Sequence, residues 1–496
     1  MNSIDSVKLS NGKRLDFIVS ADPPRGCMKY TYFTTDKSMV VQFFNDTSSL
    51  DYAQVEARLD RILHKYNPTI SEQSGGAIGN TEQTAKYFRN RFCWPIDIVH
   101  HKKYGLGIVS PCYPDNFFFG EHSARVSGMN LKGKDKNSKW FTGKSRKFLR
   151  PEELGDFRSM LQICILLSRT IRRLHQAGLA HSDLSCKNVL IDPKTATCVV
   201  IDVDALVVPN VYPPEVMGTR GYIAPEVLAT AILEPKYRKY PSIYTDLHSL
   251  AVLIYEYLLL RHPLLDGPKV YDCTSAERDD FLALGLQATF IENPTDTSNR
   301  PNDLNVTISD LGKPLEELFL KSFVDGLHKP NLRPTALEWE KGLSTTWDML
   351  HSCENPKCDK KYFIVKDVHN PVCPFCKRRV SKPIVKVDIL MESQTIKDSW
   401  VSKGNLIVED GTPIMKWHLL NRVFPDERAD RTVMAYVRYR GGKYILVNNA
   451  CNGMYSDKGN LIPTEHGVIV QNDTSIRIIH SDTNTKTILH FNIYQS

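Results

Sequence analysis

The stretch His181–Asn188 reads HSDLSCKN and runs directly into the apolar residues Val189-Leu190-Ile191. It places Asp183 and Asn188 five residues apart in a polar loop that precedes a short strand. Phosphoryl transfer requires a carboxylate near the attacking hydroxyl and an amide oxygen that helps to hold a magnesium ion. This stretch therefore predicts a phosphoryl-transfer site, around which the rest of the chain is organised.

A hairpin that ends in two further carboxylates is predicted next. The apolar residues 189–191 and 197–201 are joined by a turn, and the returning strand ends in Asp202-Val203-Asp204. Asp202 stands 14 residues after Asn188, and we assign it to the magnesium ion. Asp204 is a candidate for a second oxygen ligand, because magnesium prefers oxygen ligands.

The stretch Gly218–Glu226 reads GTRGYIAPE. Together with HSDLSCKN it resembles the motifs of Ser/Thr protein kinases, whose catalytic loop reads HRDLxxxN and whose later segment reads GTxxYxAPE. The resemblance covers about residues 10–345. It implies a bilobal α+β protein-kinase-like fold, with a small lobe over about 1–112 and a large lobe over about 113–345. It also implies ATP and magnesium or manganese as cofactors, and protein hydroxyls as acceptors.

The resemblance implies a role for several matching residues. Asp183 is the expected catalytic base, and Asn188 and Asp202 are the expected magnesium ligands. Thr219 is the expected substrate contact that favours serine or threonine over tyrosine. Lys187 is the expected cation on the transferring phosphoryl group, because tyrosine kinases carry an arginine four residues after the catalytic aspartate.

Further residues of the resemblance concern the framework of the large lobe. Asp246 corresponds to the aspartate that anchors the catalytic loop, and Arg333 corresponds to the arginine that pairs with Glu226. Ser182 stands where the family carries an arginine that pairs with a phosphate on the activation segment. We therefore expect that activity does not depend on phosphorylation of residues 205–217.

The first 45 residues alternate like the strands of a small antiparallel sheet, at residues 15–19, 28–33 and 39–44. The family carries its phosphate-binding lysine on the third of these strands, where this chain has Gln42. The segment Arg25–Tyr32, RGCMKYTY, resembles the with-no-lysine kinases, whose lysine lies on the second strand. We therefore expect Lys29 to bind the nucleotide phosphates, under a turn that contains Gly26. The alternative is a solvated Lys29 in an inactive pseudokinase.

A helix is predicted over residues 51–66, because apolar side chains recur on one face of it. Glu56 is placed on that face, where a carboxylate is costly unless it is paired. We expect Glu56 to pair with Lys29. Glu82, on a second predicted helix over residues 81–92, is the alternative favoured by its spacing from the next strand.

Residues 121–150 form an unusually long basic insert, with nine Lys or Arg residues against Glu121 and Asp135. We expect a mobile, solvated loop rather than a docking site for acidic substrate or nucleic acid. The apolar stretch 247–260 is too short to span a bilayer, and we expect a buried core helix there.

Four cysteines cluster after the kinase-like region. Their pattern is Cys353-x4-Cys358, 14 further residues, and then Cys373-Pro-Phe-Cys376. Two cysteine pairs on turn-rich knuckles supply four thiolates for tetrahedral zinc, and no ligand position is left for water. We therefore expect a small zinc ribbon over residues 346–380 with a structural zinc ion.

The last segment, residues 384–496, reads as short strands separated by turns, which predicts an all-β sandwich. Residues 444–449 and Asn472-Asp473 faintly resemble forkhead-associated domains, which bind phosphothreonine. The Gly-Arg and Ser-x-x-His elements of that family are not evident. We therefore expect a protein-binding domain as the default and phosphopeptide binding as the alternative.

The combination of kinase-like region, four-cysteine ribbon and β domain resembles the bacterial kinases associated with tellurite-resistance and stress operons. The likeness rests on HSDLS at 181–185, Val208-Pro209, Tyr212-Pro213-Pro214 and FCWP at 92–95. It implies protein partners, among which a cognate phosphatase is considered, but it identifies no substrate.

Composition restricts the other classes of function. The net charge of +7 over 496 residues is mild and gives no argument for nucleic acid. The first residues have neither the basic start nor the apolar run of a signal peptide, so we expect a cytoplasmic protein without a membrane segment. Two hypotheses stay open: an active Ser/Thr protein kinase, and a pseudokinase scaffold that binds nucleotide without phosphoryl transfer.

Overall fold

The computed structural model forms two compact units. The described residues are 3–25, 28–45, 51–209, 218–393, 395–396, 399–421, 423–480 and 485–495. Unit 1 comprises Met1–Gly155, Gln162–Pro301 and Leu320–Leu337, and unit 2 comprises Asp156–Leu161, Asn302–Phe319 and Glu338–Ser496. The domain limits that we expected at residues 345, 380 and 384 stay a prediction.

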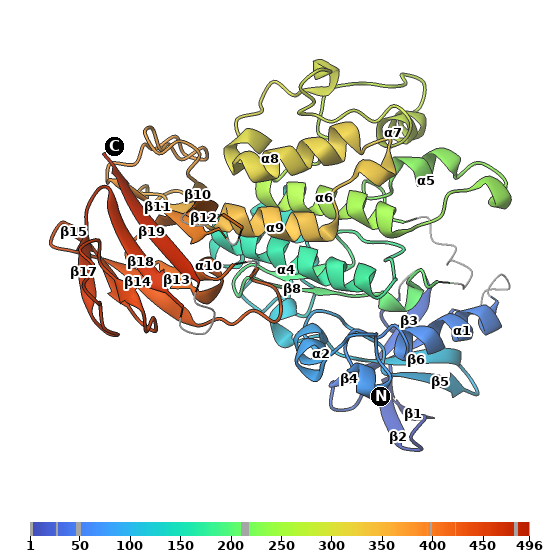
Figure 1. The fold of residues 1–496 in the computed structure, drawn as a ribbon. Coiled ribbons are helices and arrows are strands. Elements are labelled where there is room, and N and C mark those ends of the chain that lie inside the picture. Colours follow the sequence, from blue (N-terminus) through green and yellow to red (C-terminus); the bar gives the residue numbers. More distant parts are fainter. Residues whose placement is uncertain are drawn as a thin grey trace. The chain divides into compact units, whose positions relative to one another are not determined.

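Unit 1 begins with a β-hairpin and a four-stranded antiparallel sheet of order β3-β4-β6-β5 (Figure 1). The strands are β1 (Ser3–Lys8), β2 (Arg14–Val19), β3 (Lys29–Phe33), β4 (Met39–Phe44), β5 (Asp97–His101) and β6 (Gly105–Pro111). Phe17, Val41 and Phe43 are buried in one apolar cluster that joins the hairpin to the sheet. The strand β1 was not predicted, because it is mostly polar, and it is the hydrogen-bonded partner of β2.

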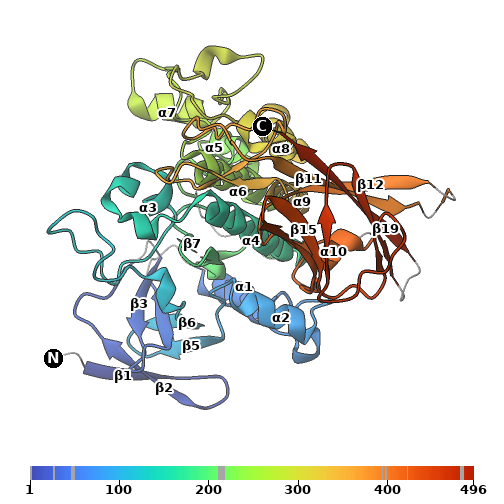
Figure 2. The same ribbon diagram turned by 90° about the vertical axis from the view of Figure 1, so that its left-hand side faces the viewer.

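Two helices accompany this sheet. Helix α1 (Tyr52–Leu63) begins at Asp51, whose side chain accepts from the backbone N–H groups of residues 53 and 54, and α2 (Glu82–Arg89) begins after the capping residue Thr81. Val55 and Leu59 of α1 pack against Phe44 and two residues of β6. Figures 1 and 2 both show α1 beside the sheet.

The helical part of unit 1 surrounds α6 (Ile243–Leu259), which is buried along nearly its whole length. This confirms the buried helix predicted from the apolar stretch 247–260. The other helices are α3 (Lys139–Thr142), α4 (Phe157–Gln176), α5 (Pro225–Thr230) and α7 (Ala276–Leu284). The predicted hairpin after the catalytic loop is β7 (Val189–Asp192) and β8 (Thr197–Val200).

The basic insert 121–150 is folded, which corrects the expectation of a solvated loop. Three of its apolar side chains are almost wholly buried, namely Leu131, Phe141 and Leu149. One of its nine cations, Lys136, is buried too, and its Nζ lies 2.9 Å from a carboxylate oxygen of Glu153 and 2.9 Å from one of Asp192. The apolar residues between the cations therefore form a buried core, which the many charged residues of the insert made hard to predict from the sequence.

The insert also pairs with the strand that follows the catalytic loop. The backbone N–H of Ile191 donates to the carbonyl of Lys136 at 3.0 Å, and the N–H of Ser138 donates to the carbonyl of Val189 at 3.1 Å. Ser138 N also lies 3.1 Å from the carbonyl oxygen of Cys186, inside the loop itself. The insert is therefore a structural neighbour of the catalytic loop.

Unit 2 contains the remaining helices and the cysteine-rich segment. Its elements are α8 (Lys313–Leu320), α9 (Ala336–Trp347), and the antiparallel pair β9 (Leu350–Ser352) and β10 (Tyr362–Ile364). Helices α8 and α9 extend by one or two residues into unit 1. Cys358 and Cys373 share an apolar cluster with Ile384 and Ile407, so the cysteine-rich segment and the first β strands have a common core.

Two antiparallel sheets form the C-terminal part of unit 2 and share one core. The first has the order β12-β11-β19-β18-β16, and the second has the order β13-β14-β15-β17. Their bounds are β11 (Ile384–Glu392), β12 (Trp400–Val408), β13 (Pro413–Met415), β14 (Val433–Arg440), β15 (Lys443–Asn448), β16 (Met454–Tyr455), β17 (Gly467–Val470), β18 (Thr474–Ile479) and β19 (Lys486–Tyr494), with a short helix α10 (Lys416–Leu419). The predicted β-rich segment is present.

Among the described residues, no helix is long and apolar enough to cross a membrane.

Candidate active site

The stretch His181–Asn188 is held from behind by the buried carboxylate of Asp246 on α6. The backbone N–H of His181 donates to Asp246 Oδ2 at 2.7 Å. The imidazole Nε2 of His181 lies 3.0 Å from the carbonyl oxygen of Ile201, at the end of the β7–β8 hairpin. Asp246 therefore holds the loop backbone, as the resemblance implied.

Asp183 lies at the centre of a hydrogen-bonded cluster with Asn188 and Thr219. The backbone N–H of Thr219 donates to Asp183 Oδ1 at 2.7 Å, and its hydroxyl donates to Asp183 Oδ2 at 3.0 Å. The side-chain amide of Asn188 donates to the carbonyl of Asp183 at 2.8 Å and to Oδ2 at 3.2 Å. The structure thus brings together three predicted site residues that are up to 36 positions apart.

The other polar residues of the loop differ in their environment. Ser182 and Ser185 are buried, while the side chain of Lys187 is exposed. The backbone N–H of Lys187 lies 3.4 Å from Ser185 Oγ, which helps to fix the turn. The catalytic role predicted for Lys187 stays a prediction that rests on its position in the loop.

Lys29 is buried at the start of β3 and forms two ion pairs. Its Nζ lies 2.9 Å from Asp202 Oδ1 and in close contact with Asp204 Oδ1. Burial alone would lower the pKa of Lys29, but the two carboxylates more than offset it and raise the pKa above its usual value. The ammonium of Lys29 in turn lowers the pKa of Asp202, against the opposing effect of burial. Lys29 is therefore a fixed cation in the cleft.

Glu56 is exposed and does not take the predicted position beside Lys29. Its Oε1 lies 3.1 Å from His100 Nε2. Glu82 is exposed as well and lies 2.9 Å from Arg89 on the same helix. The two partners of Lys29 are instead the aspartates after β8, which corrects the predicted pair of Lys29 and Glu56. The reason lies in the helix: Glu56 falls on its outer edge with Tyr52, which is itself exposed.

The charged residue that α1 buries is Arg58, which the sequence analysis missed. It is 8% exposed and shares its face of the helix with Val55, Leu59 and Ile62. The available signal was its spacing, because residues 55, 58, 59 and 62 are neighbours on a helix of 3.6 residues per turn.

Asp202 and Asp204 differ in exposure and backbone. The side chain of Asp202 is 43% exposed, and that of Asp204 is 5% exposed. Asp202 has φ = 61°, in the left-handed region, which is uncommon for a residue other than glycine. Its ion pair with Lys29 and the short helical turn that begins after it hold this conformation.

The framework ion pair predicted for Glu226 and Arg333 is present. Arg333 Nη1 lies 2.8 Å from Glu226 Oε1, and Nη2 lies 2.7 Å from Oε2. The bidentate pair joins the segment that contains Thr219 to the buried interior of unit 1, because Arg333 is 4% exposed.

Two parts of the predicted site lie outside the described residues. Gly26, the predicted turn glycine above the phosphates, is one of them, and residues 210–217 of the activation segment are the other.

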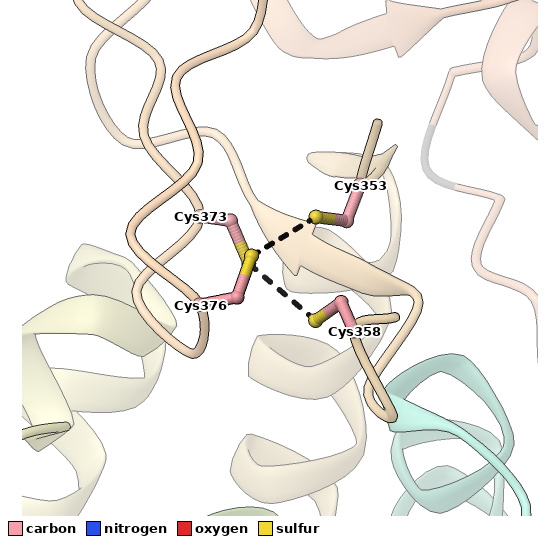
Figure 3. Close-up of side chains that lie close together, drawn as sticks. All are labelled: Cys353, Cys358, Cys373 and Cys376. Atoms are coloured by element: carbon pink, nitrogen blue, oxygen red, sulfur yellow. Dashed lines mark hydrogen bonds between the residues drawn. The ribbon is translucent and has the colours of Figure 1, made fainter. Parts of the chain in front are cut away.

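The four predicted zinc ligands lie together in unit 2 (Figure 3). All their Sγ atoms lie within 4.8 Å of one another, with 3.5 Å between Cys353 and Cys376 and 4.0 Å between Cys358 and Cys373. Four sulfur atoms at 2.3 Å from a tetrahedral zinc ion would be about 3.8 Å apart. The donor set and its spacing therefore fit a zinc ion.

Solved structures similar to this chain include two kinase-fold proteins from Toxoplasma gondii. One is described as a rhoptry kinase: the identity is 15%, the match covers 70% of this chain and 84% of that chain, and the TM-score is 0.41. Another is described as a virulence factor with a protein-kinase fold and no enzymatic activity: the identity is 14%, the coverage is 69% and 84%, and the TM-score is 0.40. No curated protein matches the chain.

A family model gives the more specific result. Residues 142–341 match the model described as the protein kinase domain. The match includes the loop His181–Asn188, the aspartates 202 and 204, and the segment Gly218–Glu226. The small-lobe sheet, with Lys29, lies before it, and the cysteine cluster lies after it. Residues 142–341 are therefore similar to the protein kinase domain over less than half of the chain.

Proposed function

We propose that the protein is a Ser/Thr protein kinase, which transfers the γ-phosphoryl group of ATP to a protein hydroxyl. The observation that carries the proposal is the cluster around Asp183. Both of its carboxylate oxygens accept hydrogen bonds, one of them from the hydroxyl of Thr219 at 3.0 Å. A substrate hydroxyl that approached Asp183 in the same way would be within reach of a general base.

Each residue then has a defined task. Asp183 orients the acceptor hydroxyl and takes up its proton, and Thr219 lines the site and favours serine or threonine. Asn188 and Asp202 supply oxygen ligands for magnesium or manganese, which neutralises charge on the phosphates when it is bound. Lys29 contacts the α- and β-phosphates, and Lys187 reaches toward the transferring group.

Transfer of labelled phosphate from ATP to the protein itself and to a generic protein substrate tests the proposal. We expect wild-type protein to label serine and threonine residues, while Asp183→Ala and Lys29→Met lose most of this activity. A removed transition-state contact typically costs about 10²-fold to 10³-fold in rate. Asp183→Ala protein that transfers phosphate as fast as wild type would refute the assignment of the base.

The second candidate is a pseudokinase scaffold that binds nucleotide without transfer. One observation favours it: Lys29 is committed to Asp202, the expected magnesium ligand. If this ion pair persisted with nucleotide bound, neither residue would be available for its task. Nucleotide binding with a normal affinity but no labelled product, at saturating magnesium and manganese, would support the scaffold over the kinase.

The C-terminal part has a separate proposed task. The cysteine cluster holds a structural zinc ion in a ribbon over residues 346–380, and the β sandwich of residues 384–496 binds a protein partner. A phosphothreonine segment, as in forkhead-associated domains, is the alternative ligand of the sandwich. The proposed location is the cytoplasm, and a cognate phosphatase is among the proposed partners.

A further inference from the structure

Helix α1 buries an arginine, and not a carboxylate, in unit 1. Arg58 is buried, and its Nε has no hydrogen-bond partner among the described residues. A buried guanidinium nitrogen without a partner is costly, so native proteins rarely leave one without a reason. The guanidinium of Arg58 therefore keeps one buried N–H donor that a carboxylate could use in another state.

Asp204 is the carboxylate whose charge acts on the pKa of Arg58. Burial lowers the pKa of Arg58, and the charge of Asp204 opposes that effect. Packing also links Arg58 to Lys29, because Lys29 Nζ lies 6.0 Å from the centre of the Phe44 ring, and Phe44 packs against Val55 and Leu59 on the Arg58 face of α1. Two cations, Lys29 and Arg58, thus share the neighbourhood of one buried carboxylate.

Nucleotide binding would remove the Lys29 ammonium from the two aspartates that it pairs with. Lys29 is paired with both Asp202 and Asp204, yet it has to contact the nucleotide phosphates. When it turns away, Asp202 gains the magnesium ion, but Asp204 is only 4% exposed and would be left without a counter-ion. An unpaired buried carboxylate costs several kcal/mol, which would work against nucleotide binding.

We propose that Arg58 is a positioning residue, which takes over the carboxylate of Asp204 when Lys29 turns to the nucleotide phosphates. This inference rests on the nucleotide-binding step of the proposed function. Every charge then keeps a partner: Lys29 binds the phosphates, Asp202 binds the metal, and Arg58 pairs with Asp204. The exchange replaces one ion pair by another and needs no acidic residue from α1.

Nucleotide affinity in the full-length protein tests the exchange. Calorimetry measures the affinity for ATP and for adenosine, with EDTA present so that a role of Asp204 in metal binding does not enter. Asp202, whose side chain is 43% exposed, is then solvated instead of metal-bound. We expect Arg58→Met to lower the affinity for ATP at least about tenfold, the equivalent of one hydrogen bond between charged groups. The affinity for adenosine stays unchanged, because adenosine has no phosphate for Lys29 to contact.

A second substitution distinguishes the exchange from a direct contact. In Arg58→Met/Asp204→Asn, Lys29 is no longer held back by a buried charge, so we expect the affinity for ATP to recover. Arg61→Met is the matched control, because Arg61 lies one turn further along α1 and donates to the carbonyl of Pro209 at 3.1 Å. It should leave the ratio of the two affinities as in wild type. Thermal unfolding checks that each variant is folded.

Three results would overturn the inference. If ATP and adenosine affinities fall together in Arg58→Met, or if neither falls, Arg58 has only a structural role. If the ATP affinity falls and Asp204→Asn does not restore it, Arg58 contacts the phosphates itself. If wild-type protein binds ATP no more tightly than adenosine, there is no phosphate contact to support. If the ATP and adenosine affinities change as expected but the protein transfers no phosphate to protein substrates, the proposed kinase activity is refuted and the exchange of Asp204 between Lys29 and Arg58 is still supported.

Discussion

Lys29 lies one strand away from the position where the resemblance to protein kinases places a lysine, and the register of the sheet relates the two positions. Thr31 on β3 is directly opposite Gln42 on β4, and cross-strand partners point to the same face. Lys29 is two residues from Thr31, so it points to that face too. Gln42 donates to the hydroxyl of Thr31 at 3.2 Å. Lys29 and Gln42 therefore lie on the same face of the sheet, on neighbouring strands.

This geometry predicts that the cation can be moved back. We expect Lys29→Gln to lower phosphate transfer about 10²-fold or more, as the loss of one transition-state contact does. The double variant Lys29→Gln/Gln42→Lys should regain about tenfold of that loss, because the new ammonium enters the cleft from the same face. Initial rates of transfer at saturating ATP measure the effect. A double variant no faster than Lys29→Gln would show that the two positions are not equivalent.

Glu256 on α6 makes stability depend on pH. It accepts a hydrogen bond from Tyr222, in the segment GTRGYIAPE, and burial raises its pKa from 4.5 to about 7. Asp266 also raises this pKa, and the hydrogen bond from Tyr222 and the charge of Lys139 lower it. Between pH 4.5 and about pH 7, Glu256 binds a proton in the folded protein that it has lost in the unfolded chain. The free energy of unfolding therefore falls as the pH rises through this range.

We therefore expect Glu256→Gln to gain stability relative to wild type as pH rises from 5 to 8. The full shift corresponds to at most about 3 kcal/mol. Urea unfolding at several pH values measures the difference, with Glu277→Gln, at an exposed position of α7, as the control. If the difference in free energy of unfolding between Glu256→Gln and wild type stays constant from pH 5 to 8, the raised pKa of Glu256 is contradicted.

At the level of elements, the insert 121–150 is stabilised by one internal cation. Lys136 is 5% exposed and has two carboxylate partners, so its loss leaves the buried Asp192 and the half-buried Glu153 without a counter-charge. We expect Lys136→Met to lower the free energy of unfolding by about 3–5 kcal/mol. Lys134→Met, two residues away and exposed, should change it by no more than about 0.5 kcal/mol. Equal effects of the two substitutions, measured by denaturant unfolding, would refute this role of the insert.

The activation segment gives a prediction from its sequence alone. Tyr212 is the only hydroxyl residue in 205–217, and it lies outside the described residues. Because Ser182 replaces the arginine that would pair with a phosphate there, we expect Tyr212→Phe to transfer phosphate at the wild-type rate. Mass spectrometry of the active protein should find this segment unmodified. A strong loss of activity in Tyr212→Phe would show that the segment is a phosphorylation switch after all.

The sequence predicted contacts between residues that are near in the chain better than contacts between residues that are far apart in the chain. Asp183 and Asn188 lie in one loop, so their spacing alone brings them together. Lys136 could not be selected from nine cations, because its partners are 17 and 56 residues away and only the fold brings them near. Helical spacing alone places Arg58 on the buried face of α1, whereas the acidic partner expected for Lys29 favoured Glu56 on the same helix.

At the level of the whole molecule, the four cysteines predict dependence on zinc. We expect one zinc ion per chain by atomic emission, and loss of both the zinc and several degrees of melting temperature in Cys358→Ser. Metal binding by such a site contributes directly to the stability of the folded state. A zinc chelator should have the same effect on wild-type protein. Cys273→Ser, at an exposed cysteine outside the cluster, is the control. Zinc-free protein that is equally stable would contradict a structural ion.

The two compact units are interleaved in the chain, which crosses from one to the other after residues 155, 161, 301, 319 and 337. Helix α4 begins in unit 2 and continues in unit 1, and α9 does the reverse. No single cut in the chain releases either unit intact: removal of everything after residue 337 would leave two segments of unit 2, Asp156–Leu161 and Asn302–Phe319, in the remaining chain.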